Sequence, residues 1–130
     1  MTVDLKMLVW TAVLCLVLFL PYVLSRIMVW GLVPTVGYPT NPPPLPLWAQ
    51  RAQRAHLNLV ENLPSFAALV LIAHVLGVSN SVTAGAAAVF FWSRLLHAAV
   101  HIAGTPYLRT PVFTVGWIAQ LVIAWQILAR

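Results

Sequence analysis

The chain has 130 residues, of which 62% are hydrophobic and only 7% are charged. Because a soluble domain carries about 25% charged residues, this composition excludes an ordinary soluble protein and indicates one embedded in a membrane. The formal charge of +5 would point to nucleic acid only if the basic residues shared one face of a soluble domain. Here the arginines lie at helix ends or within apolar segments, so nucleic-acid binding is excluded as well.

Runs of residues without charge predict four membrane-spanning helices. Nineteen such residues, from Met7 to Ser25, and twenty, from Thr110 to Ala129, form two runs, and about 20 apolar residues suffice to cross the hydrocarbon core of a bilayer. A third run of 32 residues is split by the turn-forming "GVSNS" at 77–81. The chain is therefore predicted to be all-α, an integral membrane four-helix bundle that forms one domain over residues 1–130, with helices at about Leu5–Leu32, Trp48–Leu76, Val82–Ala103 and Pro106–Ala129.

The first span and the segment after it allow alternatives. The span could be a signal peptide, but no small-residue cleavage site follows it and Arg26 continues the segment. Residues 34–46, "PTVGYPTNPPPLP", hold six of the ten prolines, which predicts a loop without helix: a stiff connection, a lid or a partner-docking strand. Cys15 is the one cysteine, so neither a disulfide framework nor a cysteine-based metal site is expected.

The basic residues predict how the chain lies in the membrane. Lys6 and Arg130 fall at one end of the bundle, and four arginines fall at the other: Arg26, Arg51, Arg54 and Arg109. By the positive-inside rule, the end with the four arginines faces the cytoplasm, with both termini on the far side.

Polar side chains follow one face of the second and third predicted helices. Because each helical residue turns the chain by about 100°, residues three and four apart share a face. The second helix presents such a stripe and the third helix a shorter one, whereas His56 points elsewhere. The stripes consist of Arg51, Arg54, Asn58 and Glu61 on the second helix and of Arg94, His97 and His101 on the third.

Glu61 and Arg94 are expected to form an ion pair, within a subunit or across an interface. Counted from the shared turn, they lie at about 24 and 20 Å along their helices. An unpaired charge inside the membrane costs about 2.5 kcal/mol or more, and Glu61 is the only acid near Arg94. The stripes could simply hold helices together. The remaining arginines have no acids to balance them, so they are expected to attract an anion, either lipid phosphate or an anionic metabolite.

Two segments resemble a known family. The string "RAHLNLVENLPSF", Arg54–Phe66, resembles the helix 2 signature of the MAPEG family, the membrane-associated proteins in eicosanoid and glutathione metabolism. In that signature an arginine is followed by an asparagine four residues on and a glutamate three further. The string "SRLLHAAVHIAGTPYLRT", Ser93–Thr110, resembles the family's helix 3 arginine and the later arginine that leads helix 4. Length and the four-span layout also match, so the resemblance covers nearly the whole chain.

The resemblance implies a homotrimer that binds glutathione near the cytoplasmic end, between neighbouring subunits, without a metal. By position, Arg54, Asn58 and Glu61 would hold the tripeptide, and Arg94 would support Glu61. Arg109 would lie beside the thiol, with Thr110 where some members have a serine. The further glutathione contacts implied are Arg51, Arg26 from a neighbouring subunit, and His97 and His101, which stand where relatives carry tyrosines.

The chemistry of these residues fits glutathione on independent grounds. The tripeptide has two carboxylates and one ammonium, which arginines and one glutamate complement. A nearby cation in a site of low dielectric favours the thiolate, so Arg109 with Thr110 would activate it. The predicted function is a glutathione-dependent transferase or peroxidase of detoxification, acting on lipophilic electrophiles or hydroperoxides. The alternatives are a lipid-binding or scaffold protein without catalysis, suggested by the missing tyrosines, and a small exporter in which an unpaired Glu61 carries protons.

Overall fold

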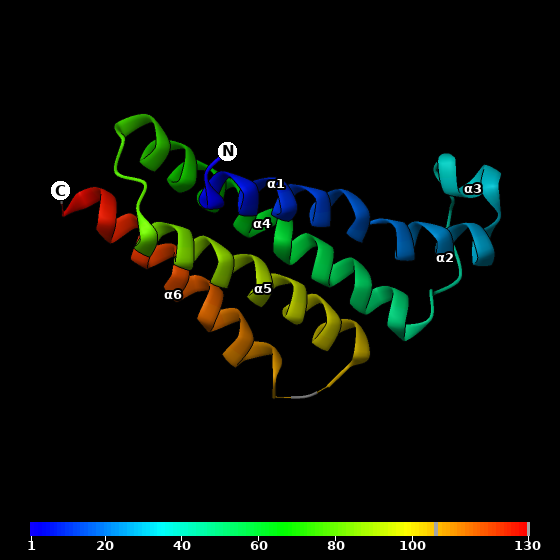
Figure 1. The fold of residues 1–130 in the computed structure, drawn as a ribbon. Coiled ribbons are helices and arrows are strands. Elements are labelled where there is room, and N and C mark those ends of the chain that lie inside the picture. Colours follow the sequence, from blue (N-terminus) through cyan, green and yellow to red (C-terminus); the bar gives the residue numbers. More distant parts are fainter. Residues whose placement is uncertain (106, 130) are drawn as a thin grey trace.

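The computed structural model describes residues 1–105 and 107–129, and these form an antiparallel bundle of helices (Figure 1). The N-terminus, the connection between the second and third long segments and the end of the last helix lie at one end of the bundle. Four segments are long and apolar enough to cross a membrane, which confirms the predicted all-α membrane fold. The helices are α1 (Val3–Leu18), α2 (Leu20–Trp30), α3 (Leu32–Val36), α4 (Leu47–Leu76), α5 (Ser81–Ala103) and α6 (Arg109–Leu128).

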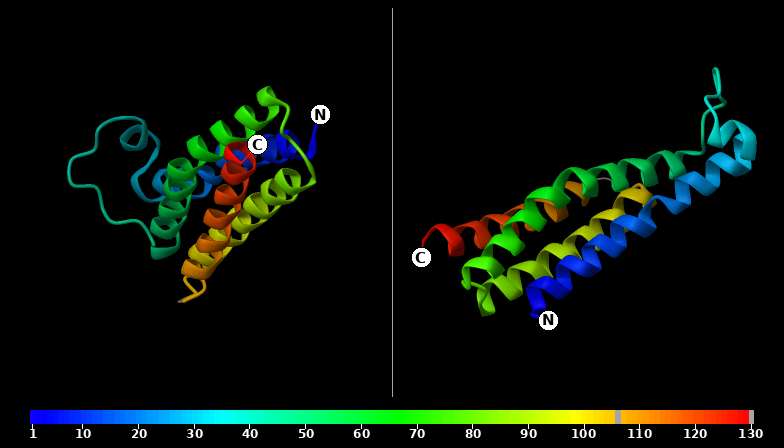
Figure 2. Two further views of the ribbon diagram at one scale, coloured as in Figure 1. Left: turned by 90° about the vertical axis from the view of Figure 1, so that its left-hand side faces the viewer. Right: turned by 90° about the horizontal axis from the view of Figure 1, so that it is seen from above.

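The first span is divided, contrary to the single helix predicted over 5–32. α1 ends at Leu18 and α2 begins at Leu20, with Pro21 in its first turn. Proline has no backbone N–H, so it cannot continue the hydrogen bonds of α1. Phe19 between the two helices keeps helical angles, φ −75° and ψ −23°, and α2 therefore continues in nearly the same direction (Figure 2).

The proline-rich segment contains one helical turn that the sequence did not predict. α3 covers Leu32–Val36, so the first three residues of the predicted loop 34–46 are helical. Pro34 is accommodated because it lies in the first turn, where its missing N–H has no partner to lose. Gly31, with φ 88°, turns the chain between α2 and α3.

The last helix begins later than predicted. The predicted start, Pro106, lies outside the described residues, as does Arg130, which counted toward the predicted orientation. Tyr107 has φ 72°, a left-handed conformation that a helix cannot include. α6 therefore starts at Arg109.

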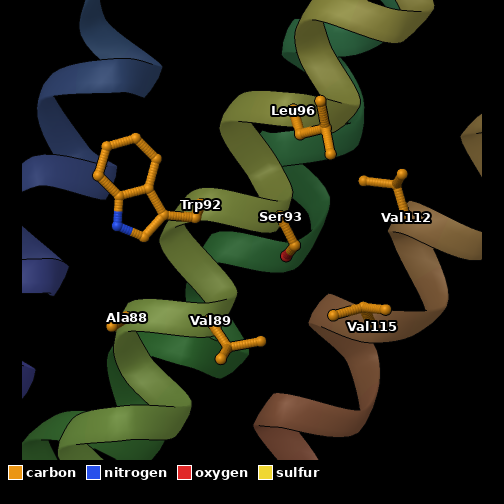
Figure 3. A pocket seen from close by; sticks show the side chains of 7 residues that line it. All are labelled: Ala88, Val89, Trp92, Ser93, Leu96, Val112 and Val115. Carbon is orange, nitrogen blue, oxygen red and sulfur yellow. The ribbon is translucent and has the colours of Figure 1, made fainter.

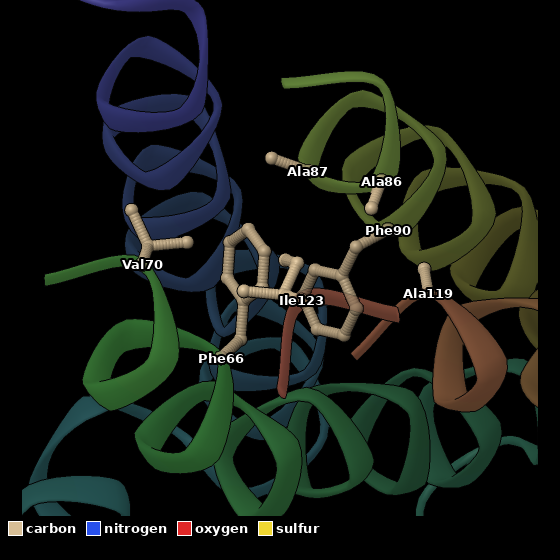
Figure 4. Packing of buried hydrophobic residues seen from close by; sticks show 7 residues of the cluster. All are labelled: Phe66, Val70, Ala86, Ala87, Phe90, Ala119 and Ile123. Carbon is tan, nitrogen blue, oxygen red and sulfur yellow. The ribbon is translucent and has the colours of Figure 1, made fainter. Parts of the chain in front are cut away.

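Aromatic and small side chains fill the core between α4, α5 and α6 (Figure 4). The rings of Phe66 and Phe90 stack with their centroids 4.0 Å apart, and neither ring is exposed. The remaining members of this cluster are Val70, Ala86, Ala87, Ala119 and Ile123. Because lipid is as apolar as these side chains, their contribution comes from close packing rather than from escape from water.

Side-chain hydrogen bonds hold the terminal end of the bundle together. Asp4 of α1 is 2% exposed, and its carboxylate accepts hydrogen bonds from the hydroxyls of Ser79 and Thr83. The amide of Asn80 donates to Gln126 at 3.0 Å, which joins the start of α5 to α6. A buried carboxylate needs such donors, because leaving it unsatisfied is costly.

His56 joins the first span to α4 away from the polar face. Its Nδ1 lies 3.0 Å from the hydroxyl of Tyr22, and its Nε2 lies 3.9 Å from the Sγ of Cys15. The polar groups of Cys15, Tyr22 and His56 therefore contact one another between α1, α2 and α4. His56 therefore packs between helices, as its place off the polar stripe predicts.

Thr83→Val should destabilise the protein by about 1–3 kcal/mol, because it leaves a buried carboxylate with one donor fewer. The hydroxyl of Thr83 also accepts from the backbone N–H of Asn80 at 2.8 Å, so the start of α5 loses a partner as well. Unfolding in detergent, followed by circular dichroism, measures the loss. The matched control is Thr114→Val, since the bond that the hydroxyl of Thr114 forms among the described residues is to the carbonyl of Thr110 within its own helix. Equal losses in the two variants would contradict the role given to Asp4.

Candidate functional site

Two adjoining pockets lie at the end of the bundle opposite to Asp4, between α4, α5 and α6. The end pocket has a volume of about 450 Å³, and the inner pocket, deeper along the same helices, has about 240 Å³. His101, Arg109 and Thr110 border both. The end pocket is further lined by Arg51, Arg54, Gly104, Thr105 and Tyr107, and the inner pocket by Asn58, His97 and Phe113.

The pockets bring together most of the residues predicted from the sequence. Arg51, Arg54 and Asn58 come from one face of α4, and the two histidines come from one face of α5, as their spacing predicts. Arg109 and Thr110 are the first two residues of α6. The connection between α5 and α6 therefore places Arg109 and Thr110 beside the polar faces of α4 and α5.

Arg51 anchors α4 to the end of α5. Its Nε donates a hydrogen bond to the carbonyl of Ile102 at 3.1 Å. Its guanidinium also lies against Gly104, where an added Cβ would come within 2.8 Å of the Cζ of Arg51. A cation at the C-terminus of a helix interacts favourably with the unpaired carbonyls there. Arg51 thus lines the end pocket and also fixes its wall.

Arg94 is the most buried cation near the pockets, at 3% exposed. Its Nη2 donates to the side-chain oxygen of Asn58 and lies 3.5 Å from Nδ1 of His97. Its Cζ lies 5.3 Å from the centroid of the Phe113 ring, within range of a cation–π interaction. The guanidinium itself does not line either pocket, but three side chains of the inner pocket contact it.

The predicted ion pair between Glu61 and Arg94 is not formed within the subunit. Glu61 is exposed, and Arg94 bonds instead to Asn58, one turn further from the α4–α5 connection. The prediction placed both groups by helix length alone, whereas the reach of the arginine side chain decides its partner. A pair across a subunit interface stays a prediction. Glu61 lines neither pocket.

Arg26 lies apart from the pockets within the subunit. Its Cζ lies 5.1 Å from the ring centroid of Tyr22 and 5.6 Å from that of Trp30. Its Nε is buried and has no hydrogen-bond partner among the described residues. The predicted contribution of Arg26 to a neighbouring subunit's site stays a prediction.

His97 and His101 are both buried and meet edge to face, with ring centroids 5.5 Å apart. His97 is 2% exposed and His101 9%. Nδ1 of His101 is buried and has no hydrogen-bond partner in the part of the chain that the structure describes. His101 therefore borders both pockets with a ring whose Nδ1 is not satisfied by any described residue.

The charge of the two pockets is one-sided. Three guanidinium groups line them, and none of the described residues that line them is acidic. Such a site attracts an anion, and arginines bind carboxylates through two parallel hydrogen bonds. No group of three His, Cys, Asp or Glu side chains able to hold a metal ion occurs within residues 1–105 and 107–129.

Tyr107 is a pocket residue that the sequence analysis missed. It lines the end pocket, in a chain whose third helix lacks the expected tyrosines. Its left-handed backbone cannot be foreseen from residue type, because such angles are uncommon outside glycine. The available signal was its place two residues before Arg109 on the same connection.

Apolar grooves run along the outside of α5 and α6. One groove of about 360 Å³ is bordered by Val89, Leu96, Val112 and Val115 (Figure 3). A second of about 340 Å³ shares Val89 and Val115 with it. Val112 lines the first groove while Phe113, the next residue, lines the inner pocket. The same two helices therefore present an apolar surface on one side and a cationic pocket on the other.

Gly104→Ala should destabilise the protein more than Gly77→Ala. Both glycines follow a helix with left-handed angles, φ 74° and 71°, so each alanine costs about 1–2 kcal/mol of backbone strain. Only at Gly104 would the new Cβ also displace the guanidinium of Arg51, because nothing lies within 4 Å of a Cβ at Gly77. Unfolding of both variants in detergent measures the difference, which should vanish in an Arg51→Ala background. A difference that persists there would contradict the anchoring role of Arg51.

The comparison with known families agrees with the fold. Residues 7–129, nearly the whole chain, match the model of the MAPEG family. No curated protein and no solved structure matches the chain. The family includes glutathione transferases, glutathione peroxidases and proteins of eicosanoid synthesis, and the four apolar spans fit its membrane location. The chain is therefore an integral membrane protein that belongs to the MAPEG family.

Proposed function

We propose that this protein binds glutathione in the end and inner pockets and activates its thiol against lipophilic electrophiles or hydroperoxides. The observation that carries the proposal is the convergence of three arginines, an asparagine and two histidines from three helices on adjoining pockets. Their volumes suit a small ligand, since such sites measure about 300–1,000 Å³.

The donors of the site complement the acceptors of the tripeptide. Glutathione carries two carboxylates, and Arg51 and Arg54 lie at the open end of the pockets, where they would bind a carboxylate through two parallel bonds. Asn58, fixed by Arg94, would bind the peptide backbone deeper in. The orphaned nitrogen of His101 would gain a partner, which supports the fit of a polar ligand at this depth.

Arg109 and Thr110 are the proposed catalytic pair. They border both pockets, so a thiol at the boundary between the pockets would lie beside them. A guanidinium stays charged at any working pH, and a positive charge in a site of low dielectric favours the thiolate over the thiol. The hydroxyl of Thr110 would donate a hydrogen bond to the sulfur. The thiolate then attacks the substrate, and the leaving group departs with the electron pair of the broken bond.

The assembly and orientation are part of the proposal. Glu61 is exposed and Arg26 lies outside the pockets within one subunit. In a homotrimer, each would be available to a site shared with a neighbour, where Glu61 would bind the ammonium of glutathione. The positive-inside rule would place the pockets toward the cytoplasm, and the lipophilic substrate would arrive from the bilayer along the apolar surface of α5 and α6.

Lipid binding without catalysis is a second candidate function, favoured by the apolar grooves between α5 and α6. The exporter hypothesis requires a Glu61 without an arginine partner. No ion pair of Glu61 with an arginine is formed among the described residues, but the family match places the chain among MAPEG proteins instead. The two experiments below separate the enzyme from the lipid-binding protein.

Arg54→Ala should weaken glutathione binding by about 10–100-fold, because a charge-assisted hydrogen bond is worth about 1.5–3 kcal/mol. Asn58→Ala should weaken it as well, by removing a polar contact and releasing Arg94. Titration calorimetry on purified protein in detergent gives the affinities. His74→Ala is the control, since His74 is exposed in the last turn of α4, far from the pockets. Wild-type protein that shows no saturable binding at millimolar glutathione would leave only the lipid-binding function.

Arg109→Ala should lower the rate of glutathione conjugation to 1-chloro-2,4-dinitrobenzene by about 100-fold, as expected when one stabilising donor is lost from a developing or bound anion. Arg109→Lys keeps the charge and should retain part of the rate. Absorbance of bound thiolate near 240 nm should fall in parallel. Turnover equal to the uncatalysed background in both wild type and Arg109→Ala would refute the enzyme.

A further inference from the structure

His101 combines three properties that no other described residue of the pockets shares. It is 9% exposed, it borders both the end and the inner pocket, and its Nδ1 is buried without a hydrogen-bond partner in the described part of the chain. Imidazole is also the side chain best suited to take and return a proton near neutral pH. Arg109 and Thr110 border the same two pockets, so a thiol held beside them also lies near His101.

His97 differs from His101 because one of its ring nitrogens contacts Arg94. An arginine has donors only, so the contact at 3.5 Å between Nη2 of Arg94 and Nδ1 of His97 makes that nitrogen an acceptor. In the neutral ring the other nitrogen, Nε2, then carries the hydrogen and acts as a donor. Arg94 thereby fixes His97 in one tautomer. Nδ1 of His101 has no such partner among the described residues, so no contact there fixes which of its two nitrogens carries the hydrogen.

We propose that His101 accepts the proton of the bound thiol and returns it to an oxygen leaving group, so that the site favours hydroperoxides over halogenated electrophiles. This inference rests on the proposed function and adds a catalytic residue to it. Arg109 cannot fill this role because a guanidinium is not deprotonated in proteins, and His97 is held by Arg94. Moving the proton from sulfur to imidazole also leaves the total charge of the pocket unchanged, so no proton has to leave the site.

The chemical steps balance for a hydroperoxide ROOH. The S–H bond of glutathione breaks, the proton goes to the imidazole of His101, and the electron pair stays on sulfur. Sulfur then attacks the terminal oxygen, the S–O bond forms and the O–O bond breaks. The departing alkoxide takes the proton from the imidazolium and leaves as the alcohol ROH. The sulfenic acid of glutathione condenses with a second glutathione to give the disulfide and water.

Conjugation to a chlorinated nitroarene makes a different demand on the site. The thiolate replaces chlorine at carbon, and chloride leaves as a stable anion that needs no proton. His101 would then have to give its proton to water before the next turnover. Loss of His101 should therefore affect the two reactions unequally, whereas damage to the pocket's shape should affect both alike.

The decisive experiment compares the two reactions in wild type and His101→Asn. The asparagine amide keeps a hydrogen-bonding group near Nδ1 but cannot take up a proton. At saturating glutathione, the kcat for cumene hydroperoxide should fall about 100-fold, within the usual contribution of general acid–base catalysis. The kcat for 1-chloro-2,4-dinitrobenzene should fall less, because conjugation loses only the acceptor of the thiol proton and not a donor to the leaving group. His101→Gln serves as a second variant, and His56→Asn controls for loss of a histidine outside the pockets.

A second measurement follows the proton itself. When glutathione binds to wild-type protein in weak buffer, thiolate absorbance should rise with little acidification of the medium, because His101 keeps the proton. In His101→Asn, each thiolate formed should release its proton to a pH indicator. Equal proton release in the two proteins, or equal losses of kcat for both substrates, would overturn the role of His101 while leaving glutathione binding intact. Wild-type protein that does not bind glutathione would instead overturn the proposed function.

Discussion

The hydrogen bond from Arg94 to Asn58 is the interaction on which the site depends. A guanidinium buried at this depth in an apolar bundle must find acceptors within the protein, because lipid supplies none. It finds them in the amide oxygen of Asn58 and in Nδ1 of His97, and it packs over the ring of Phe113. One buried cation thus orients three side chains of the inner pocket. The two helices that carry the polar stripes are joined by this contact.

The charges of the bundle are arranged unequally between its two ends. At the terminal end, the carboxylate of Asp4 accepts hydrogen bonds from the hydroxyls of Ser79 and Thr83, so its charge is stabilised by the protein itself. At the other end, the guanidinium groups of Arg51, Arg54 and Arg109 line pockets without any acidic side chain among the described residues. The described residues of these pockets therefore supply positive charge without a balancing carboxylate.

Features set by composition and helical spacing were predictable, and features set by side-chain reach or a single dihedral angle were not. Uncharged runs gave the four spans, and the spacing of Arg51, Arg54 and Asn58 gave their common face. The break at Phe19 was not predicted, because a proline is also compatible with the first turn of a new helix and the sequence does not show where that helix begins. The partner of Arg94 was not predicted, because a long side chain can reach groups that lie a full helical turn apart. Tyr107 was missed because its backbone angle does not follow from its residue type.

The contact of Asp4 with the α4–α5 connection has a mechanical consequence. Together with the bond between Asn80 and Gln126, it clamps α1, α5 and α6 at one extremity of the bundle. The opposite extremity has the longer connections, residues 37–46 and 104–108. If the helices separate at the pocket end to admit a large ligand, they must rotate about the end that these hydrogen bonds hold together.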